Sequence, residues 1–276
     1  MRLLVVGTVP IEDGAAISGE VSVTGDRLRV GDTPLPSCQG TAAMLLAASA
    51  ATNATGAKAP HAVLGGDIGR GDGTRAAYAA LPAYARECDA SIIAFHYLQP
   101  IMALMRHAVE QVGDGRMLVA DAGGMYAARA AGIAPRFELM TPDIGEIGFL
   151  ADSEAVHPAY VANYLFGQSG FNPEEYARLA WERGGSGRVV LVKGKTDRIC
   201  VEGRLHATVE EPTVPQLEAI GGTGDTITGL AAGLMAGGLS TAEAALLAAR
   251  CNRLAGERIG ATPGHRAEDL VRAFPA

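Results

Sequence analysis

A glycine-rich turn that leads into an apolar helix is the segment with the most recognisable chemistry. It reads Gly-Gly-Thr-Gly-Asp over residues 221–225 and continues as Thr-Ile-Thr-Gly-Leu. Glycines let the backbone turn sharply and expose its N–H groups, and the following helix directs the positive end of its dipole to the same place. We therefore expect an anion there, with Asp225 in the first helical turn, placed to take a proton from a hydroxyl group or to help hold a metal ion. The structural alternative is that Asp225 is only a first-turn acid favoured by the helix dipole.

A second candidate contact for an anion lies at the end of the apolar run Val189-Val-Leu-Val. Lys193 offers a point charge to a phosphate group, and Gly194 permits close approach of a ligand. A solvated lysine at a strand end is the alternative. In the helix after Asp225, Gly229 and Gly233 stand among apolar residues, which predicts that this helix packs closely against another element.

A second glycine-rich cluster, Gly-Gly-Asp-Ile-Gly-Arg-Gly-Asp-Gly-Thr over residues 65–74, lies between an expected strand and an expected helix. It lacks the Gly-Lys-Ser/Thr of a P-loop and the glycine spacing of a dinucleotide fingerprint. Ligands of open α/β sheets bind at the carboxyl ends of strands, so Asp67, Arg70 and Asp72 are candidate substrate contacts for hydroxyls or an anionic group. A helix cap formed by Asp72-Gly-Thr is the alternative. His96 lies at another expected strand end. It is either a further substrate contact or a structural histidine.

The elements that must position these residues follow from hydrophobic periodicity. Short aliphatic runs alternate with Ala/Leu-rich stretches of helical period, which is typical of βα units and a mostly parallel sheet. Strands are expected at 2–6, 62–66, 90–95, 117–120, 188–193, 197–201 and 205–209. Helices are expected at 40–52, 74–87, 98–112, 122–131, 173–184, 224–236, 241–259 and 266–273, with one more opening near Glu146 after Thr141-Pro142.

Two stretches depart from this alternation. Residues 20–31 read as a short polar hairpin with Gly25-Asp26 as its turn, which would serve as a lid, a decoration or a dimer contact. Residues 197–209 read as a second hairpin around Glu202-Gly203, at an antiparallel edge of the sheet. The length of 276 residues, without repeats or a long linker, predicts one α/β domain over residues 1–276.

Composition narrows the classes of partner. A formal net charge of −7 and the lack of a basic run argue against nucleic acid as a partner. No uninterrupted apolar stretch reaches the length of a membrane span, and the start of the chain does not resemble a signal peptide. The four cysteines (Cys38, Cys88, Cys200 and Cys251) are far apart, which favours free thiols in a reducing compartment. We expect a cytoplasmic protein that does not associate with a membrane.

Gly-Gly-Thr-Gly-Asp-Thr-Ile-Thr-Gly resembles the signature of the ribokinase superfamily, and more closely that of its NAD(P)H-hydrate dehydratase branch. Three further stretches agree in order: Val-Ala-Asp-Ala-Gly at 119–123, Leu-Met-Thr-Pro-Asp-Ile-Gly-Glu-Ile at 139–147, and Val-Val-Leu-Val-Lys-Gly-Lys-Thr at 189–196. The tail from Cys251-Asn-Arg-Leu-Ala-Gly-Glu resembles the last two helices of that branch. The chain departs from the branch where Asp143-Ile-Gly-Glu replaces His-Pro-Gly-Glu, and where Phe95-His-Tyr-Leu-Gln-Pro replaces a Gly-Pro-Gly-rich loop.

The resemblance covers roughly residues 90–275 and implies a three-layer α/β/α ribokinase-like fold that binds ATP or ADP with Mg²⁺. Asp225 is implied as the catalytic base and Glu146 as a residue that organises Mg²⁺, although Glu146 and Asp143 are equally explained as helix N-terminal acids. Asp121 is implied as a substrate contact. The implied nucleotide contacts are Lys193, Gly194, Gly222, Thr223, Gly224 and Asn252.

The expected function is activation of a hydroxyl of a small-molecule substrate by phosphoryl transfer from the nucleotide. In the dehydratase branch, the phosphorylated hydroxyl is then eliminated to restore NAD(P)H. Two alternatives stay open: a kinase for a sugar, hydroxymethylpyrimidine or vitamin, and a nucleotide-binding regulatory protein without turnover. The sequence does not decide the acceptor, the choice between ATP and ADP, or whether the protein forms a homo-oligomer.

Overall fold

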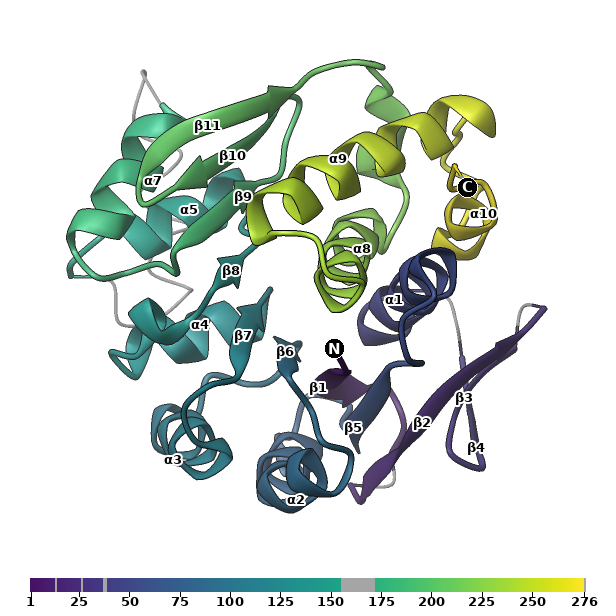
Figure 1. Ribbon diagram of the computed structural model, residues 1–276, viewed down its shortest axis with the longest axis vertical. Coiled ribbons are helices and arrows are strands. Elements are labelled where there is room, and N and C mark those ends of the chain that lie inside the picture. The colour runs from purple at the N-terminus through teal and green to yellow at the C-terminus, as the bar shows by residue number, and fades with distance from the viewer. Residues whose placement is uncertain (13, 26, 37–38, 155–171, 276) are drawn as a thin grey trace.

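A computed structural model describes residues 1–12, 14–25, 27–36, 39–154 and 172–275 (Figure 1). Its strands form one 11-stranded sheet in the order β11-β10-β9-β8-β7-β6-β1-β5-β2-β3-β4. The six central strands are parallel, and they are β1 (Leu3–Val9), β5 (His61–Gly66), β6 (Ile92–His96), β7 (Met117–Ala120), β8 (Leu139–Met140) and β9 (Val189–Val192). The sequence prediction of a mostly parallel central sheet is confirmed.

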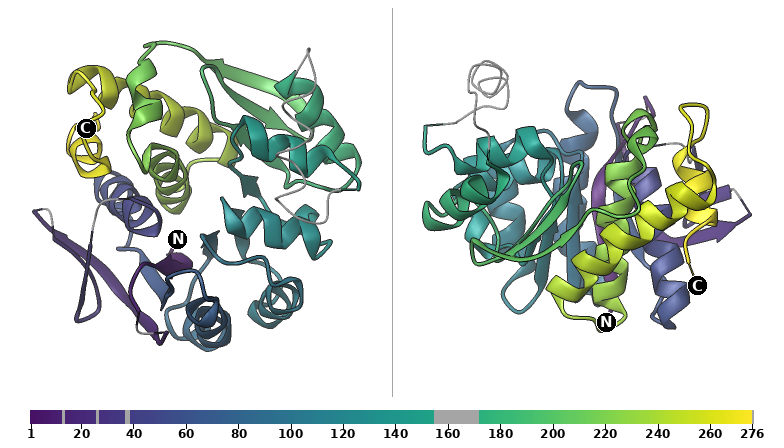
Figure 2. Two further views of the ribbon diagram at one scale, coloured as in Figure 1. Left: turned by 180° about the vertical axis from the view of Figure 1, so that it is seen from behind. Right: turned by 90° about the horizontal axis from the view of Figure 1, so that it is seen from above.

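Helices cover both faces of this sheet, because side chains alternate between the faces along each strand. In β1, Leu3 and Val5 pack with α1 (Thr41–Thr55), α8 (Thr223–Ala236) and α9 (Thr241–Arg258). Leu4 and Val6 point to the other face, which is covered by α2 (Asp72–Glu87), α3 (Met102–Val112), α4 (Gly123–Ala130), α5 (Ile144–Ala151) and α7 (Pro173–Glu182). Figures 1 and 2 show this arrangement of three layers, with the short helix α10 (Ala267–Arg272) beside α1.

The predicted close packing of the helix that carries Asp225 is confirmed. A Cβ atom added at Gly229 would lie 2.1 Å from the carbonyl oxygen of Met44 in α1, and one at Gly233 would lie 2.6 Å from the Cβ of Ala51. Neither site can accept a side chain without separating the two helices. The two glycines therefore allow the backbones of α8 and α1 to lie very close together.

Both predicted hairpins are present. The first is larger than expected, because β2 (Ala16–Thr24) pairs with β5 as well as with β3 (Arg27–Val30), and β3 pairs with β4 (Thr33–Leu35). It therefore extends the sheet by three antiparallel strands. The second joins β10 (Asp197–Val201) to β11 (Arg204–Val209). Its turn residues, Glu202 and Gly203, both have positive φ angles, as a tight two-residue hairpin turn requires.

Most other predicted elements agree within a few residues, with two differences. The helix predicted from residue 98 begins at Met102, because residues 98–101 form the loop that leaves β6. The two-residue strand β8 was not predicted, since Leu139–Met140 is too short to give a strand pattern. Two 3₁₀ turns, Ala134–Arg136 and Pro215–Ala219, join larger elements.

The cysteines agree with the expectation of free thiols where the structure describes them. Cys88 and Cys200 are buried and Cys251 is partly buried, all three unpaired, whereas Cys38 lies outside the described residues. Burial raises the pKa of the Cys251 thiol, so it has no feature of a reactive cysteine. None of the described helices combines the length and the apolar character needed to span a membrane.

Candidate active site

Four neighbouring parallel strands end at one edge of the sheet, and each delivers a polar residue there. His96 is the last residue of β6, and Asp121, Thr141 and Lys193 directly follow β7, β8 and β9. The first turn of α8 faces this edge and adds Asp225. Predicted residues that are up to 129 positions apart in the chain are thus brought together. Carboxyl ends of parallel strands are the usual place for a ligand in such a sheet.

Asp225 is almost fully enclosed and accepts a hydrogen bond at each carboxylate oxygen. Its Oδ1 lies 3.0 Å from Nε2 of His96, and its Oδ2 accepts from the backbone amide of Gly40, at 2.9 Å. Burial alone would raise the pKa of the Asp225 carboxyl, but His96, Lys193 and the Gly40 amide together hold that pKa below its usual value. Asp225 is therefore a carboxylate at neutral pH.

Asp121 forms the second carboxylate of the cluster and is 1% exposed. It accepts from Nζ of Lys193 at 2.8 and 3.1 Å, and from the hydroxyl of Thr228 at 2.5 Å. Thr228 in turn lies 2.8 Å from the hydroxyl of Thr141. Burial opposes the charge on Lys193, but Asp121 and Glu146 hold its pKa above the usual value, so the ammonium persists.

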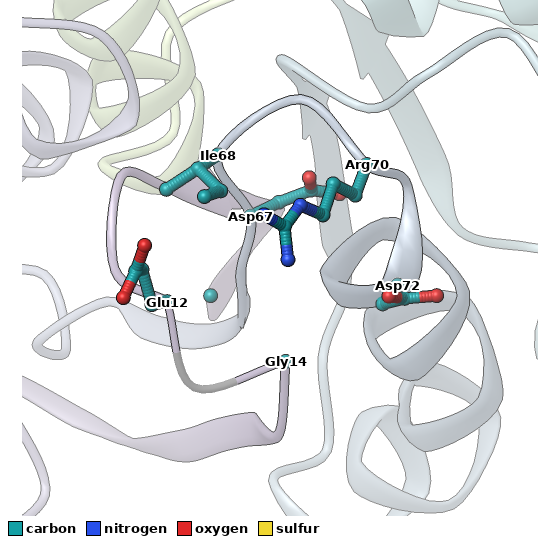
Figure 3. A pocket seen from close by; sticks show the side chains of 7 residues that line it. Glu12, Gly14, Asp67, Ile68, Arg70 and Asp72 are labelled. Carbon is teal, nitrogen blue, oxygen red and sulfur yellow. The ribbon is translucent and has the colours of Figure 1, made fainter.

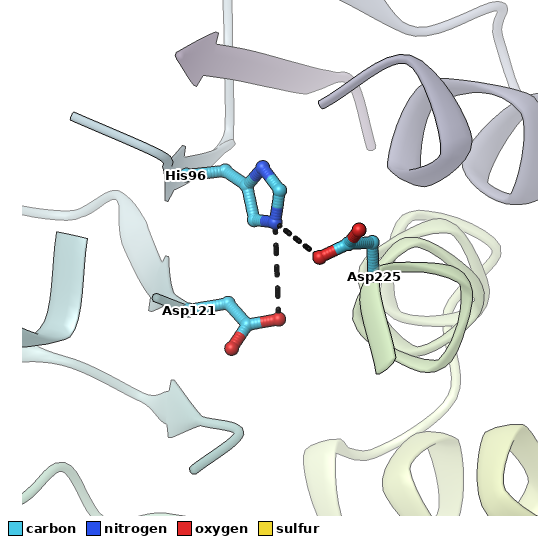
Figure 4. Close-up of side chains that lie close together, drawn as sticks. All are labelled: His96, Asp121 and Asp225. Carbon is cyan, nitrogen blue, oxygen red and sulfur yellow. Dashed lines mark hydrogen bonds and ion pairs between the residues drawn. The ribbon is translucent and has the colours of Figure 1, made fainter. Parts of the chain in front are cut away.

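His96 lies between the two carboxylates and is fully buried (Figure 4). Its Nε2 is 3.0 Å from Oδ1 of Asp225 and 3.9 Å from Oδ2 of Asp121. Its Nδ1 is 3.0 Å from the hydroxyl of Thr41, the first residue of α1. Both ring nitrogens are thus engaged by the protein, and the substrate contact predicted for His96 stays a prediction without a free ring nitrogen to support it.

The residues immediately after His96 and Asp121 have strained backbones. Tyr97 has a φ angle of 48° and Ala122 one of 46°, in the left-handed region that non-glycine residues rarely adopt. Tyr97 is 50% exposed and packs the edge of its ring against His96, with ring centroids 4.5 Å apart. Strain at two adjacent strand ends, next to buried charges, is a recurrent mark of functional sites.

The residues predicted to bind the nucleotide phosphates, Gly222 and Gly224, lie at the N-terminus of α8. Together with Lys193 and the cluster of His96, Asp121 and Asp225 they form the nucleotide corner. Gly222 is the N-cap residue with a φ angle of 93°, and no side chain caps the helix. The amides of Gly224 and Asp225 therefore remain available to an anion. Lys193 lies against the same turn, because a Cβ added at Gly224 would be 3.4 Å from its Nζ.

Two other predicted nucleotide contacts have internal partners. The hydroxyl of Thr223 donates to the carbonyl oxygens of Leu217 and Ile220, so only its backbone faces the anion site. Asn252 is 2% exposed, and its Oδ1 accepts from the hydroxyl of Thr226 at 2.8 Å. Their nucleotide roles stay predictions.

Gly194 is held by a buried arginine that the sequence analysis did not select. Arg253 of α9 donates to Oδ2 of Asp197 at 2.8 Å, and its two terminal nitrogens donate to the carbonyl oxygens of Gly194, Lys195, Glu210 and Pro212. All five N–H groups of the guanidinium are used. Arg253 therefore fixes the loops that follow β9 and β11, on the Lys193 side of the corner.

Glu146 and Asp143 form a reciprocal cap at the N-terminus of α5. Oε2 of Glu146 accepts from the Asp143 amide at 2.8 Å, and Oδ1 of Asp143 accepts from the Glu146 amide at 2.7 Å. Burial, Asp121 and Asp143 raise the pKa of the Glu146 carboxyl, against the opposing effect of Lys193. Carboxylate oxygens are the ligands that a hard divalent cation prefers, and Glu146 would supply one of them. The cap also fits the helix-acid alternative, and the metal role stays a prediction.

The remaining predicted residues line a separate, open pocket of about 340 Å³ between the loops after β1 and β5 (Figure 3). Arg70 is exposed and its side chain reaches into the pocket, with Glu12 and Asp72 on either side. Asp67 also lines it, but its carboxylate accepts from the amides of Gly69, Gly71 and Thr74 and from the Thr74 hydroxyl. Asp67 thus holds its own loop, whereas Arg70 reaches into the pocket and Asp72 is exposed at its rim.

Sequence reasoning missed several residues of the corner. Gly40 and Thr228 contact the charged groups directly, but neither a glycine before a helix nor a threonine within one carries a distinct signal. Thr41 was considered only as a substrate contact in a capped helix start, and the structure shows it bonded to His96. Arg253 is missed because one arginine in a helix of mixed composition resembles a solvated residue.

Comparison with known proteins assigns the family. The model of the NAD(P)H-hydrate dehydratase family matches residues 99–275. The chain belongs to the NAD(P)H-hydrate dehydratase family. An ADP-dependent (S)-NAD(P)H-hydrate dehydratase of Xanthomonas campestris is 31% identical over 269 residues, which are 94% of this chain and 85% of that protein. An uncharacterised protein of Methanocaldococcus jannaschii is 37% identical over 213 residues, 76% of this chain and 87% of that protein.

Solved structures place this family member in the ribokinase-like fold. The pyridoxal kinase of Staphylococcus aureus in complex with AMP-PCP and pyridoxal superposes with a TM-score of 0.58 over 92% of this chain and 86% of that one, at 12% identity. A putative phosphomethylpyrimidine kinase of Bacteroides thetaiotaomicron gives a TM-score of 0.56 over 96% and 87%, at 15% identity. The predicted superfamily and its three-layer fold are confirmed.

Proposed function

We propose that this protein is a nucleotide-dependent NAD(P)H-hydrate dehydratase that uses ATP or ADP. One observation carries the proposal: an ionised, enclosed aspartate sits in the first turn of an uncapped helix, with a buried lysine against the same turn. That arrangement combines an anion site with a base within reach of it. The family membership supports hydrated NAD(P)H as the acceptor.

In this scheme each residue of the corner has one task. The amides of Gly224 and Asp225 and the ammonium of Lys193 hold the terminal phosphate oxygens and stabilise the charge that develops on them. Asp225 takes the proton of the acceptor hydroxyl as its oxygen bonds to phosphorus and the nucleotide leaves. The C–O bond to the phosphorylated oxygen then breaks and phosphate leaves, while the adjacent ring carbon loses a proton to solvent, which forms the double bond of the reduced nicotinamide.

Magnesium is the expected metal. Glu146, with Asp143 beside it, would hold the ion through carboxylate oxygens, and the ion would neutralise charge on the nucleotide phosphates. In the absence of Mg²⁺ these residues would still cap α5, since their cap bonds are made within the protein.

The direct test is to incubate the protein with hydrated NADH, Mg²⁺ and either ATP or ADP, and to follow the absorbance of reduced nicotinamide. Absorbance should return with at least one nucleotide and not without nucleotide. No recovery with either nucleotide would exclude the dehydratase, and the nucleotide that works would decide between ATP and ADP.

A small-molecule kinase is the second candidate, and one observation favours it. Solved structures of a pyridoxal kinase and a putative phosphomethylpyrimidine kinase superpose over 92% and 96% of this chain. Should hydrated NADH fail, phosphorylated product from a panel of sugars, hydroxymethylpyrimidine and vitamins would identify the kinase, and tight nucleotide binding without any product would indicate the regulatory alternative.

A further inference from the structure

The hydrogen bonds around His96 fix the number of protons on its ring. The hydroxyl of Thr41 lies 2.8 Å from the backbone carbonyl oxygen of Thr8, which can only accept, so its single hydrogen has an acceptor there. With that hydrogen directed to Thr8, the 3.0 Å bond between Oγ1 of Thr41 and Nδ1 of His96 has the ring nitrogen as its donor, and Nδ1 carries a hydrogen.

The other ring nitrogen faces acceptors as well. Nε2 lies 3.0 Å from Oδ1 of Asp225, and Oδ2 of Asp121 is its next acidic neighbour at 3.9 Å. An ionised carboxylate has no hydrogen to give, so Nε2 must be the donor to Asp225. In a neutral ring with Nδ1 protonated, the lone pair of Nε2 would face a carboxylate oxygen in a fully buried place, which is unfavourable.

A positively charged His96 also compensates the negative charge of the two buried carboxylates. Asp121 and Asp225 bring two negative charges to a buried place, and the ammonium of Lys193 compensates one through its bonds to Asp121. An imidazolium at His96, 3.0 Å from Asp225, supplies the second positive charge. The other ionisable groups nearby are Tyr97, whose pKa burial and the carboxylates raise to about 12, and Glu146 at the start of α5.

We propose that His96 is an imidazolium in the resting protein and that it is the positioning residue of Asp225. It holds one oxygen of the carboxylate while the Gly40 amide holds the other. The plane of the carboxylate is then fixed before an acceptor arrives, and the remaining lone pairs are directed to the reacting hydroxyl. The catalytic half of this inference rests on the proposed function, whereas the protonation state does not.

A divalent metal bound by His96, Asp121 and Asp225 is the competing explanation, since one ligand atom from each lies within 4.8 Å of the others. Both oxygens of Asp121 are already bonded to Lys193, and they also accept from the Ala122 amide and the Thr228 hydroxyl. The positive charge of Lys193, which is bonded to Asp121, would repel a metal cation bound by the same carboxylate. The test below includes this outcome.

The protonation state can be measured without any assay of activity. After removal of metals with EDTA, the chain labelled with ¹⁵N in its histidine rings is examined at pH 7, and the His96 signals are assigned by their loss in His96→Gln. Two ring nitrogens that both carry hydrogen support the proposal. One bare nitrogen would overturn it, and so would stoichiometric Zn²⁺ or Mn²⁺ binding that is lost with His96→Gln.

Thr41 supplies a second variant in case His96→Gln does not fold. Thr41→Val removes the acceptor of Nδ1 and should change the ¹⁵N signal of Nδ1, whereas Thr41→Ser keeps the hydroxyl and should give the wild-type signal. An unchanged Nδ1 signal in Thr41→Val would contradict the assignment of Nδ1 as donor.

The positioning role is tested by kinetics with hydrated NADH and the nucleotide that supports its repair. His96→Gln should lower kcat by about 100-fold with the nucleotide KM unchanged, because the carboxylate is misplaced while the phosphate site is intact. An unchanged kcat in His96→Gln would refute the role; a wild type without turnover would instead refute the proposed function and leave the NMR result standing.

Discussion

The corner around Asp225 and the pocket around Arg70 lie along the same edge of the sheet, but they use their polar groups differently. In the corner, Asp121, His96 and Asp225 are buried, and every nitrogen or oxygen of their side chains has a protein partner. In the pocket, Arg70 and Asp72 are exposed, and their charges point to open space. One region is organised before a ligand arrives, whereas the other awaits a ligand to complete its interactions.

We propose that the first region carries the chemistry and the second selects the acceptor. A buried network with full partners holds its geometry, which suits proton transfer and charge stabilisation at phosphate. An open pocket with unpaired charges contributes only when a ligand supplies the partner, which suits recognition of the acceptor. Substitutions in the two regions should therefore differ in kind as well as in size.

The largest effect is expected in the corner, from Asp225→Asn. The amide keeps the shape of the side chain but cannot take a proton, so kcat for repair of hydrated NADH should fall by about 1,000-fold. Nucleotide affinity, measured by calorimetry without acceptor, should change little. Turnover within about 10-fold of the wild type would remove Asp225 from the mechanism.

A smaller effect, on stability, is expected from Arg253→Met at the border of the corner. The substitution leaves Asp197 buried without its cation, and burial already raises the pKa of this carboxyl. We expect a loss of about 3 kcal/mol in the free energy of unfolding, measured with urea, and a higher nucleotide KM because the loops at Gly194 and Glu210 loosen. Arg250→Met, at an exposed position of the same helix, is the matched control. Equal stability of the two variants would show that the guanidinium is not needed.

The smallest effect is expected in the open pocket, from Arg70→Ala. It should raise the acceptor KM by about 10-fold, since one charged hydrogen bond to a ligand is lost. The urea midpoint and the nucleotide KM should stay at wild-type values. Arg75→Ala, an exposed arginine on α2, controls for the loss of charge. A fall in kcat at an unchanged acceptor KM would assign Arg70 to the chemistry and weaken the contrast between the regions.

The sequence predicted the frame of the molecule well, because the strands at the centre are continuous aliphatic runs and the helices have clear periods. It also predicted which elements carry Asp225, Lys193 and Asp121, since a glycine-rich turn and strand ends have local signatures. Contacts that depend on the fold were out of reach. Nothing in the local sequence of His96 reveals that Thr41, 55 residues earlier, occupies its Nδ1.

The acceptor side shows the same limit more strongly. Asp67 and Asp72 are both acids in one glycine-rich loop, and sequence alone gave them the same role. Their surroundings differ, because Asp67 accepts four bonds from its own loop while Asp72 stays exposed. Only the path of the backbone separates a loop-forming acid from one that is available to a ligand.

The close packing of α1 against α8 limits which residues can stand at Gly229 and Gly233. Gly40 and Gly222 are the N-cap residues of the two helices, and the hydrogen bond from the Gly40 amide to Asp225 joins their first turns. Gly229 and Gly233 lie against α1, and they set the distance between the two helices. Larger side chains at these positions would push the first turns of α1 and α8 apart and displace Asp225, which lies one to two turns away. Under the proposed function, two glycines that contact no reacting group therefore determine the position of the base.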